Sequence, residues 1–189
     1  MELEPSDIIR IAVFILGSAF FLSFSWRSLR NPFSHGFHRF FAMEGILALV
    51  LLNFPYWHDE MFSPRQLFSW ALLILSILLV VSGLLNLRRH GGHQHRQDQL
   101  ENLAFENTER VVRDGIYRYI RHPMYGSLLL LAWGALLKHL GPGETVITVL
   151  VSLLIFQTAR MEERENIDFF GEDYTDYMKG TKMFIPYIL

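Results

Sequence analysis

The sequence predicts an all-α integral membrane protein with five transmembrane helices. Of its 189 residues, 51% are hydrophobic and only 19% are charged. The apolar residues gather in five runs that carry few or no charges, each a candidate membrane helix. If the five runs cross a bilayer in alternating directions, 14 of the 17 Lys and Arg residues lie on one side of it. Length, apolarity and charge bias therefore agree on this fold class.

The composition also excludes several classes of site and partner. The chain has no cysteine, which excludes a disulfide scaffold, a thiolate metal site and a cysteine nucleophile. Its formal charge of -2 provides no overall positive field of the kind that favours nucleic-acid binding. The expected partner is the lipid bilayer, with no nucleic acid.

Three helices are expected in the first half of the chain. Residues 11–26 are uncharged, and their helix is expected to begin near Ile8. Residues 37–57 form a second run, in which Glu44 is the only charged residue after Arg39, so this carboxylate must face the protein interior or a partner. Residues 66–87 are twenty-two uncharged residues, long enough at about 1.5 Å per residue to cross about 30 Å of hydrocarbon.

The second half contains two shorter apolar runs, at residues 123–137 and 145–159. The segment between them contains Gly141-Pro142-Gly143, which predicts a turn and hence a helical hairpin. Each run has fifteen residues, which is short for a full span. One or both helices are therefore expected to continue beyond the hydrocarbon, with a charged half following the apolar half.

The charge bias predicts the orientation of the chain. The N-terminus is expected outside and the C-terminus in the cytosol, because the polar segment 88–122 and the tail then share the positive side. Residues 1–189 are expected to form a single membrane domain. Within it, residues 1–87 would be a three-helix scaffold and residues 88–189 the half that carries the chemistry.

A metal site formed by His90, His93 and His95 is one alternative for the polar segment. Imidazoles at H-x-x-H-x-H spacing can bind a transition metal. The surrounding residues are typical of a solvated loop, however, and no cysteine or suitably spaced carboxylate completes a tetrahedral set. The sequence therefore predicts no metal site here. His35 and His38 are interpreted as interfacial residues for the same reason.

Residues 115–125 lead directly into the fourth apolar run and combine tyrosines, arginines and His122-Pro123. Proline is favoured in the first turn of a helix, because it lacks the N–H that would be unpaired there. His122 is therefore expected at the entrance of a membrane helix. The simplest interpretation of this segment is a belt of interfacial side chains, and a binding site is the alternative.

Glu162 and Glu163 lie where the fifth helix is expected to leave the bilayer. Helical partners lie three or four residues apart, and Glu163 has Arg160 at that distance, which predicts a surface ion pair. Glu162 has no cation at these positions. It must be solvated or paired elsewhere, which makes it the first candidate for a ligand contact.

The motif G-x-Y-x-x-x-R-H-P-x-Y at residues 115–125 is followed about 40 residues later by the Glu162-Glu163 pair and then by F-G-x-x-Y-x-x-Y at residues 170–177. This combination resembles the isoprenylcysteine carboxyl methyltransferase family and its phospholipid methyltransferase relatives. The resemblance implies S-adenosylmethionine as the cofactor, in a pocket over which the cytosolic loop and the C-terminal segment close. Carried over to matching positions, the cofactor-binding residues are Val111, Val112, Tyr117, His122, Pro123, Met124, Tyr125 and Glu162.

The resemblance also implies a lipophilic small-molecule or prenylated methyl acceptor. Methyl transfer from a sulfonium mainly requires alignment and the exclusion of water. A carboxylate acceptor needs a cation to orient it, so Arg160 and Arg164, with Glu163, are the expected catalytic residues. An amine acceptor would instead need a base or a lowered pKa. The sequence leaves both acceptors open.

Two other function classes compete with a methyltransferase. Some membrane sterol reductases resemble the same C-terminal pattern and bind NADPH, but its phosphates require several cations or a glycine-rich loop, and this chain has no G-x-G-x-x-G. A non-catalytic membrane scaffold would use His122, Tyr125 and Glu162 only as belt residues. The sequence favours a methyltransferase.

Overall fold

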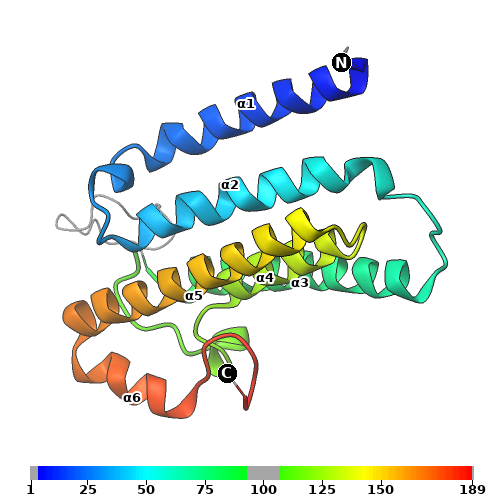
Figure 1. The fold of residues 1–189 in the computed structure, drawn as a ribbon. Helices are drawn as coiled ribbons and strands as arrows, with labels where there is room; N and C mark the ends of the chain where they lie inside the picture. The colour runs from blue at the N-terminus through cyan, green and yellow to red at the C-terminus, as the bar shows by residue number, and fades with distance from the viewer. Residues whose placement is uncertain (1–3, 93–106, 189) are drawn as a thin grey trace.

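A computed structural model describes residues 4–92 and 107–188, and these residues form an all-helical bundle (Figure 1). Within them, a single β-bridge between Ile120 and Lys182 is the only strand-like pairing. The predicted all-α class is therefore confirmed. The α-helices are α1 (Pro5–Ser25), α2 (His35–Asn53), α3 (Pro64–His90), α4 (Pro123–Leu136), α5 (Pro142–Phe170) and α6 (Glu172–Gly180), and the 3-10 helices are η1 (Ser28–Arg30), η2 (Phe54–Tyr56) and η3 (Gly115–Arg118).

Local sequence explains where these helices begin. Four of them, α1, α3, α4 and α5, have a proline in the first turn, where its fixed φ suits the helix and its missing N–H costs nothing. Serine caps two helices: Ser34 accepts a hydrogen bond from the Phe37 N–H in α2, and Ser63 accepts one from the Gln66 N–H in α3.

Among the described residues, four helical segments are long and apolar enough to cross a membrane: α1, α2 with its η2 extension, α3 and α5. The predicted continuation of the hairpin is confirmed in α5, which runs through its charged half to Phe170. The fifth apolar helix, α4, has 14 residues, or about 21 Å, which is less than the hydrocarbon thickness of about 30 Å. That all five helices cross the bilayer stays a prediction.

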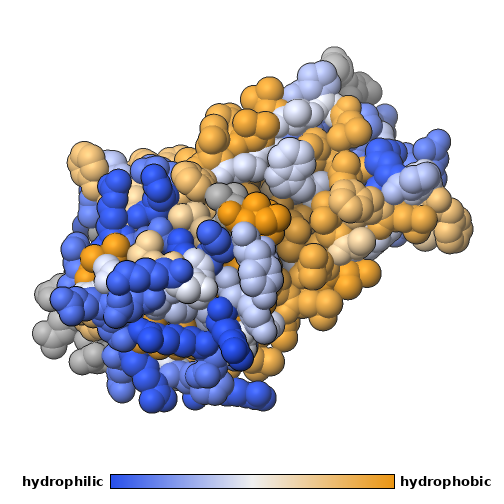
Figure 2. Space-filling view, turned by 90° about the horizontal axis from the view of Figure 1, so that it is seen from below, coloured by the Kyte–Doolittle hydropathy of each residue, from blue (hydrophilic) through white to orange (hydrophobic). Residues whose placement is uncertain are grey.

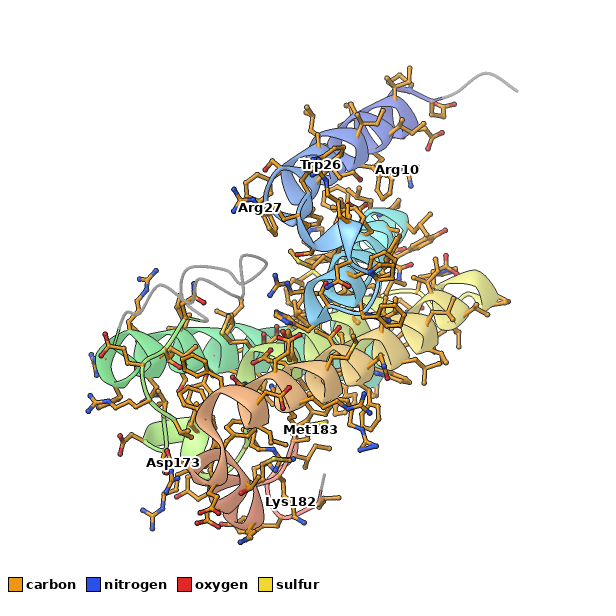
Figure 3. The ribbon with its side chains drawn as sticks, turned by 90° about the vertical axis from the view of Figure 1, so that its left-hand side faces the viewer. Arg10, Trp26, Arg27, Asp173, Lys182 and Met183 are labelled. Atoms are coloured by element: carbon orange, nitrogen blue, oxygen red, sulfur yellow. The ribbon has the colours of Figure 1, made fainter. Side chains whose placement is uncertain are left out.

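The helices pack as two pairs, α2 with α5 and α3 with α4, and α4 also packs against α5. The first helix, α1, packs against α2 at the edge of the bundle (Figures 1 and 3). There Ser18 Oγ donates to Glu44 Oε2 at 2.6 Å. The prediction that Glu44 must find a partner inside the protein is therefore correct.

Small residues allow the helices to approach closely, as is usual between membrane helices. A Cβ at Gly45 would lie only 2.4 Å from Val151 of α5. Hydroxyl groups on α3 then donate to backbone carbonyls of α4: Ser69 to Gly134 at 2.6 Å and Ser76 to Ser127 at 2.8 Å. These bonds hold α4 in a defined position along α3.

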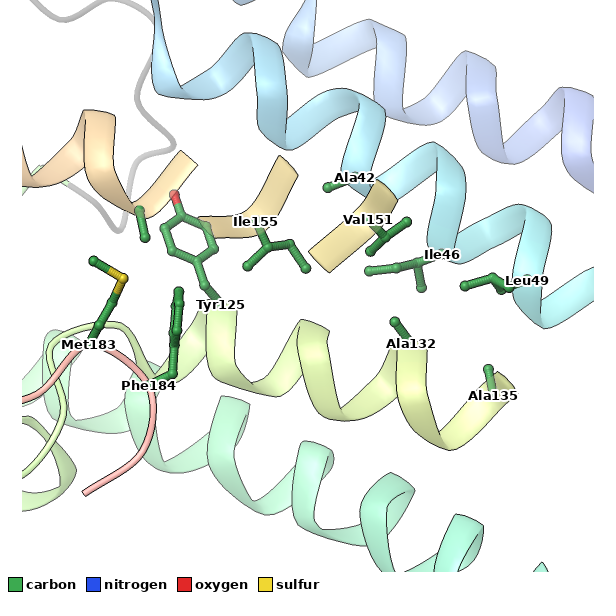
Figure 4. Packing of buried hydrophobic residues seen from close by; sticks show 11 residues of the cluster. Ala42, Ile46, Leu49, Tyr125, Ala132, Ala135, Val151, Ile155, Met183 and Phe184 are labelled. Carbon is green, nitrogen blue, oxygen red and sulfur yellow. The ribbon is translucent and has the colours of Figure 1, made fainter. Parts of the chain in front are cut away.

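The hydrophobic core lies between α2, α4 and α5 and extends to the C-terminal segment. Figure 4 shows Tyr125 of α4 directed toward α5, beside Met183 and Phe184 of that segment. The other members follow the α4 axis: Ala42, Ile46, Leu49, Ala132, Ala135, Val151, Ile155 and Ala159. At the start of α4, the core therefore ends at the C-terminal segment, where Met183 and Phe184 pack beside Tyr125.

At the opposite end of α4, the side chain of Lys138 is completely buried. Its Nζ donates to Gln66 Oε1 at 3.0 Å and lies 3.6 Å from the ring centroid of Trp70. Arg65 donates to the carbonyl groups of Leu137 and Lys138. These contacts join the start of α3 to the α4–α5 turn.

Because α4 is short, α3 and α5 both extend beyond its first residue at the other end. Gly83 of α3 lies against Pro123, where α4 begins, and α3 continues to His90. The fifth helix also continues, carrying its charged residues beyond the apolar core. Polar residues gather at this end of the molecule, next to a mostly apolar surface (Figure 2). The candidate site lies in the space between these two extensions.

Candidate active site

A pocket of about 100 Å³ lies at the start of α4. Its walls come from the start of α2, the end of α3, the segment around η3, the first turn of α4, the charged half of α5 and α6. Both halves of the chain therefore contribute. The lining residues are His35, Leu87, Thr108, Val111, Val112, Tyr117, Arg121, His122, Pro123, Met124, Tyr125, Glu162, Glu165, Asn166, Phe170, Tyr174 and Tyr177.

All eight residues that the family resemblance assigns to the cofactor line this pocket. They come from two places in the chain, the segment 111–125 and Glu162 of α5. Folding brings these segments together because α5 runs back past the start of α4. Their role in binding a cofactor stays a prediction.

His122 lies between the two carboxylates of α5. It is the N-cap residue of α4, but its side chain does not cap that helix. Instead, its Nδ1 lies 3.8 Å from Glu162 Oε1, and its Nε2 lies 3.4 Å from Glu163 Oε1. Its ring stacks on Tyr125 with a centroid distance of 5.6 Å. The buried imidazole thus connects both glutamates to the wall of the pocket.

The predicted surface ion pair between Arg160 and Glu163 is wrong. Glu163 is buried, and its Oε1 accepts a hydrogen bond from Arg121 Nε at 2.7 Å. It lies behind the pocket lining rather than in it. Because α5 packs against the start of α4, the face that carries Glu163 points inward, and a partner from a distant segment replaces the helical neighbour.

The other two expected catalytic residues lie outside the pocket. Arg160 and Arg164 are exposed, and neither lines it. The guanidinium of Arg160 lies over the ring of Phe156, 5.4 Å from its centroid. Among the described pocket residues, the cation is Arg121, which already binds Glu163.

His35 is not the interfacial residue that the sequence predicted. Its side chain is 2% exposed and lines the pocket. Its Nδ1 lies 2.6 Å from Glu165 Oε2, and its backbone N–H donates to Glu165 Oε1 at 3.4 Å. No local signal could have found this pair, because 130 residues separate its members.

Tyr174 and Tyr177 place α6 against the pocket. Burial, with the nearby carboxylates of Glu162 and Glu163, raises the pKa of Tyr174 well above its usual range. Burial also raises the pKa of Tyr177, whose hydroxyl donates to the Tyr117 carbonyl at 2.7 Å. Both phenols therefore remain protonated. They were visible in the sequence only as part of the motif at residues 170–177.

The C-terminal segment is hydrogen-bonded to the residues that precede α4. The Arg121 N–H donates to the Lys182 carbonyl at 2.8 Å, and the His122 N–H donates to the Met183 carbonyl at 3.1 Å. Farther out, Arg113 donates to the backbone of Asp173 at 2.7 Å. Figure 3 shows Asp173, Lys182 and Met183 at this polar end of the molecule. These bonds hold α6 and the tail beside the pocket.

A larger apolar groove of about 960 Å³ lies along α4, from Gly126 near its start to Leu137 at its end. It runs between α3, α4 and α5, and it reaches the C-terminal segment. Tyr125 lines the pocket while its neighbour Gly126 lines the groove, so the two adjoin at α4. The groove residues are Phe68, Leu72, Leu75, Leu79, Ile116, Ile120, Gly126, Leu129, Leu130, Trp133, Leu137, Ser152, Phe156, Phe184, Ile185 and Pro186.

The described residues contain no group of three or more His, Asp or Glu side chains that could hold a metal ion. His90 ends α3, and its carbonyl accepts a hydrogen bond from Arg110 at 2.7 Å. His93 and His95 lie outside the described residues. The interpretation of this histidine cluster as a solvated loop stays a prediction.

Comparison with known proteins identifies the family. The family model described as phospholipid methyltransferase matches residues 64–173, which is more than half of the chain and includes the pocket segments of α4 and α5. The chain belongs to the phospholipid methyltransferase family. The resemblance predicted from the motifs is therefore confirmed.

Individual relatives of this phospholipid methyltransferase family member carry two kinds of name. Protein-S-isoprenylcysteine O-methyltransferase from Saccharomyces cerevisiae is 29% identical over 136 residues, covering 68% of this chain and 56% of the relative. Methanethiol S-methyltransferase 1 from Bradyrhizobium diazoefficiens is 31% identical over 72 residues, covering 38% of this chain and 25% of the relative. A probable protein-S-isoprenylcysteine O-methyltransferase from Oryza sativa subsp. japonica is 23% identical over 181 residues, covering 91% and 90%. The chain thus spans between a quarter and just over half of the first two.

Proposed function

We propose that the protein is an S-adenosylmethionine-dependent membrane methyltransferase that acts on a lipophilic acceptor at the cytosolic face. One observation carries this proposal: the residues that the family resemblance assigns to the cofactor line a single pocket, and that pocket adjoins a large apolar groove at α4. Family membership and the methyltransferase names of the relatives support the same reaction class.

The pocket residues suit a cofactor of this chemistry. When bound, S-adenosylmethionine would supply an electrophilic methyl group on a positively charged sulfonium. Glu162 offers a carboxylate for an ammonium group, and the rings of Tyr117, Tyr125 and Phe170 offer faces that attract a cation or stack on a base. The pocket volume of about 100 Å³ is below the roughly 300 Å³ from which ligand pockets begin. Binding therefore requires the pocket to widen.

The apolar groove supports a lipid-borne acceptor. Its lining is almost entirely aliphatic and aromatic, and Ser152 is its one hydroxyl among the described residues. A hydrocarbon chain that enters this groove from the bilayer exchanges one apolar environment for another, so its binding there depends on van der Waals packing against the groove side chains. With the tail in the groove, the reacting end of the acceptor would reach the pocket beside Tyr125, where the surrounding side chains exclude water and fix its direction of approach.

The expected catalytic residues receive separate roles in this proposal. Glu163 holds Arg121 and His122 in place from behind the pocket. Arg160 stands over Phe156, a groove residue, and is therefore the cation available to orient a carboxylate acceptor. Arg164 contacts neither space and is the weaker candidate.

The proposed orientation places the C-terminus in the cytosol. The lysine and arginine distribution supports it, with 14 of 17 on that side. The length of α4, about 21 Å, is shorter than the hydrocarbon layer of about 30 Å. If α4 is the fifth crossing, its first residue therefore lies within the membrane, and the segment before it spans the remaining distance to the cytosolic surface. The pocket then opens near the membrane surface, within reach of both a soluble cofactor and a lipid.

Calorimetric titration of the purified protein in detergent tests this function. We expect saturable binding of S-adenosylmethionine and none of NADPH. Binding of NADPH alone would favour the reductase, and binding of neither ligand by folded protein would favour the non-catalytic scaffold. Transfer of labelled methyl groups to N-acetyl-S-farnesylcysteine, phosphatidylethanolamine and methanethiol then identifies the acceptor. Transfer to methanethiol alone would contradict a lipophilic acceptor.

A further inference from the structure

Two carboxylates of α5 line the pocket, and each faces a histidine from the start of another helix. Glu162 lies 3.8 Å from His122, the residue that precedes α4. Glu165, three residues later, lies 2.6 Å from His35, the first residue of α2. Residues three apart share a helix face, so both carboxylates belong to one wall of the pocket. The motif explains the first pair and leaves the second without a role.

Two contacts with His35 hold the carboxylate of Glu165 in a defined position. His35 is 2% exposed and offers Glu165 two donors, its backbone N–H to Oε1 and its Nδ1 to Oε2. The carboxylate therefore lies against the N-terminus of α2, where the helix dipole favours a negative charge. The side chain of Glu165 remains 27% exposed, at the pocket.

The acceptor capacity that remains on Glu165 suggests its ligand. An ionised carboxylate has about four lone-pair sites, two on each oxygen. His35 occupies one site on each oxygen, which leaves one on each within the part of the chain that the structure describes. Two adjacent acceptors match two adjacent hydroxyl donors, and a ribose carries such a cis-diol. Carboxylates bind ribose hydroxyls in other nucleotide sites.

His35 and Glu165 lie away from the groove proposed to bind the methyl acceptor. Both His35 and Glu165 line the pocket, but α2 contributes no residue to the apolar groove. A group on this wall is therefore placed to contact the cofactor rather than the methyl acceptor. Glu162, whose carboxylate faces His122 at the longer distance of 3.8 Å, remains the better partner for an ammonium group.

We propose that Glu165, positioned by His35, binds the ribose diol of the adenosyl cofactor. This inference rests on the proposed function. It assigns the nucleoside half of the cofactor to the second histidine–glutamate pair and the amino-acid half to the first. The N-terminus of α2, a helix outside the family motif, thereby becomes part of the cofactor site.

Calorimetry of the full chain with S-adenosylhomocysteine and its 2′-deoxy and 3′-deoxy analogues tests this assignment. In the wild type, we expect removal of one hydroxyl to raise Kd about tenfold or more, as for a hydrogen bond to a charged group. In Glu165→Ala, S-adenosylhomocysteine should bind more weakly, and the ratio between its Kd and that of the analogues should fall close to one. His35→Ala should reduce the ratio in the same direction.

Glu162→Gln is the matched control, since it should weaken all three ligands and keep the ratio of the wild type. If Glu165→Ala does not fold, Glu165→Met, which keeps the side-chain length and has no oxygen acceptor, supplies the same comparison. A ratio near one in the wild type, or an unchanged ratio in a folded Glu165 variant, would overturn the assignment and leave the methyltransferase proposal intact. Failure of the wild type to bind S-adenosylhomocysteine at all would instead contradict the proposed function.

Discussion

Arg121 Nε donates to Glu163 Oε1 at 2.7 Å behind the pocket, and the two side chains are only 10% and 7% exposed. Removing one member of a buried ion pair leaves the other charge without compensation and costs about 3–5 kcal/mol. We therefore expect Glu163→Gln to lower the thermal unfolding midpoint in detergent markedly. The double variant Arg121→Met, Glu163→Met should be more stable than the sum of the single changes predicts. Additive losses would show that the pair is not coupled.

Glu162 and His122 should be needed for cofactor binding. We expect Glu162→Gln and His122→Ala each to weaken S-adenosylmethionine binding by about tenfold or more, because each removes a charged or polar contact from the pocket wall. Calorimetric titration measures this change. Asp168→Asn, an exposed carboxylate on the same helix, serves as the control and should bind like the wild type. Wild-type affinity in both pocket variants would show that the site is wrongly assigned.

The absence of cysteine makes the orientation easy to test, because a single introduced thiol has no background. We expect Asp173→Cys to react with a membrane-impermeant maleimide only from the cytosolic side. Phe62→Cys, at an exposed position in the α2–α3 connection, should react only from the outside. Labelling of sealed vesicles of both orientations gives the answer. The opposite pattern would reverse the proposed topology.

The apolar groove should select the acceptor and not the cofactor. Leu75 of α3 lines the groove, and Leu78, one turn later, is 61% exposed outside it. We expect Leu75→Trp to lower kcat/KM for a lipid-borne acceptor about tenfold or more while the Kd for S-adenosylmethionine stays unchanged. Leu78→Trp should leave both constants unchanged. Equal effects of the two tryptophans on acceptor kinetics would argue against acceptor binding in the groove.

Lys138 should make stability depend on pH. Burial and the nearby charge of Arg65 lower the pKa of Lys138 to about 8, from 10.5 for an ordinary lysine. Between these values the unfolded chain binds more protons than the folded one, so the free energy of unfolding rises with pH. We expect the unfolding midpoint, relative to that of Lys138→Met, to increase from pH 8 to pH 10. Lys179 is exposed, so Lys179→Met should show the same change of unfolding midpoint with pH as the wild type. If Lys138→Met also shows the wild-type change, Lys138 is not the cause of the pH dependence.

Much of the fold was predictable because it depends on contiguous residues. The length of an apolar run determines whether a helix can span a bilayer, and prolines and serines mark where helices begin. The two equal runs of fifteen residues indicated that one or both helices of the hairpin continue beyond the hydrocarbon, and only the structure showed that α5 continues and α4 does not. The family resemblance, which the motif at residues 115–125 and the glutamate pair support, likewise predicted eight residues that line one pocket.

By itself, the sequence determined the helical membrane architecture and the local groups that form one side of the site. Only the tertiary structure decided which charges meet. Glu163 pairs with Arg121 rather than with Arg160, His35 reaches Glu165 across 130 residues, and Lys138 is buried between tryptophans. Helical periodicity identifies neighbours three or four residues apart, whereas these partners depend on how α2, α4 and α5 pack. That packing places the second histidine–glutamate pair in the pocket.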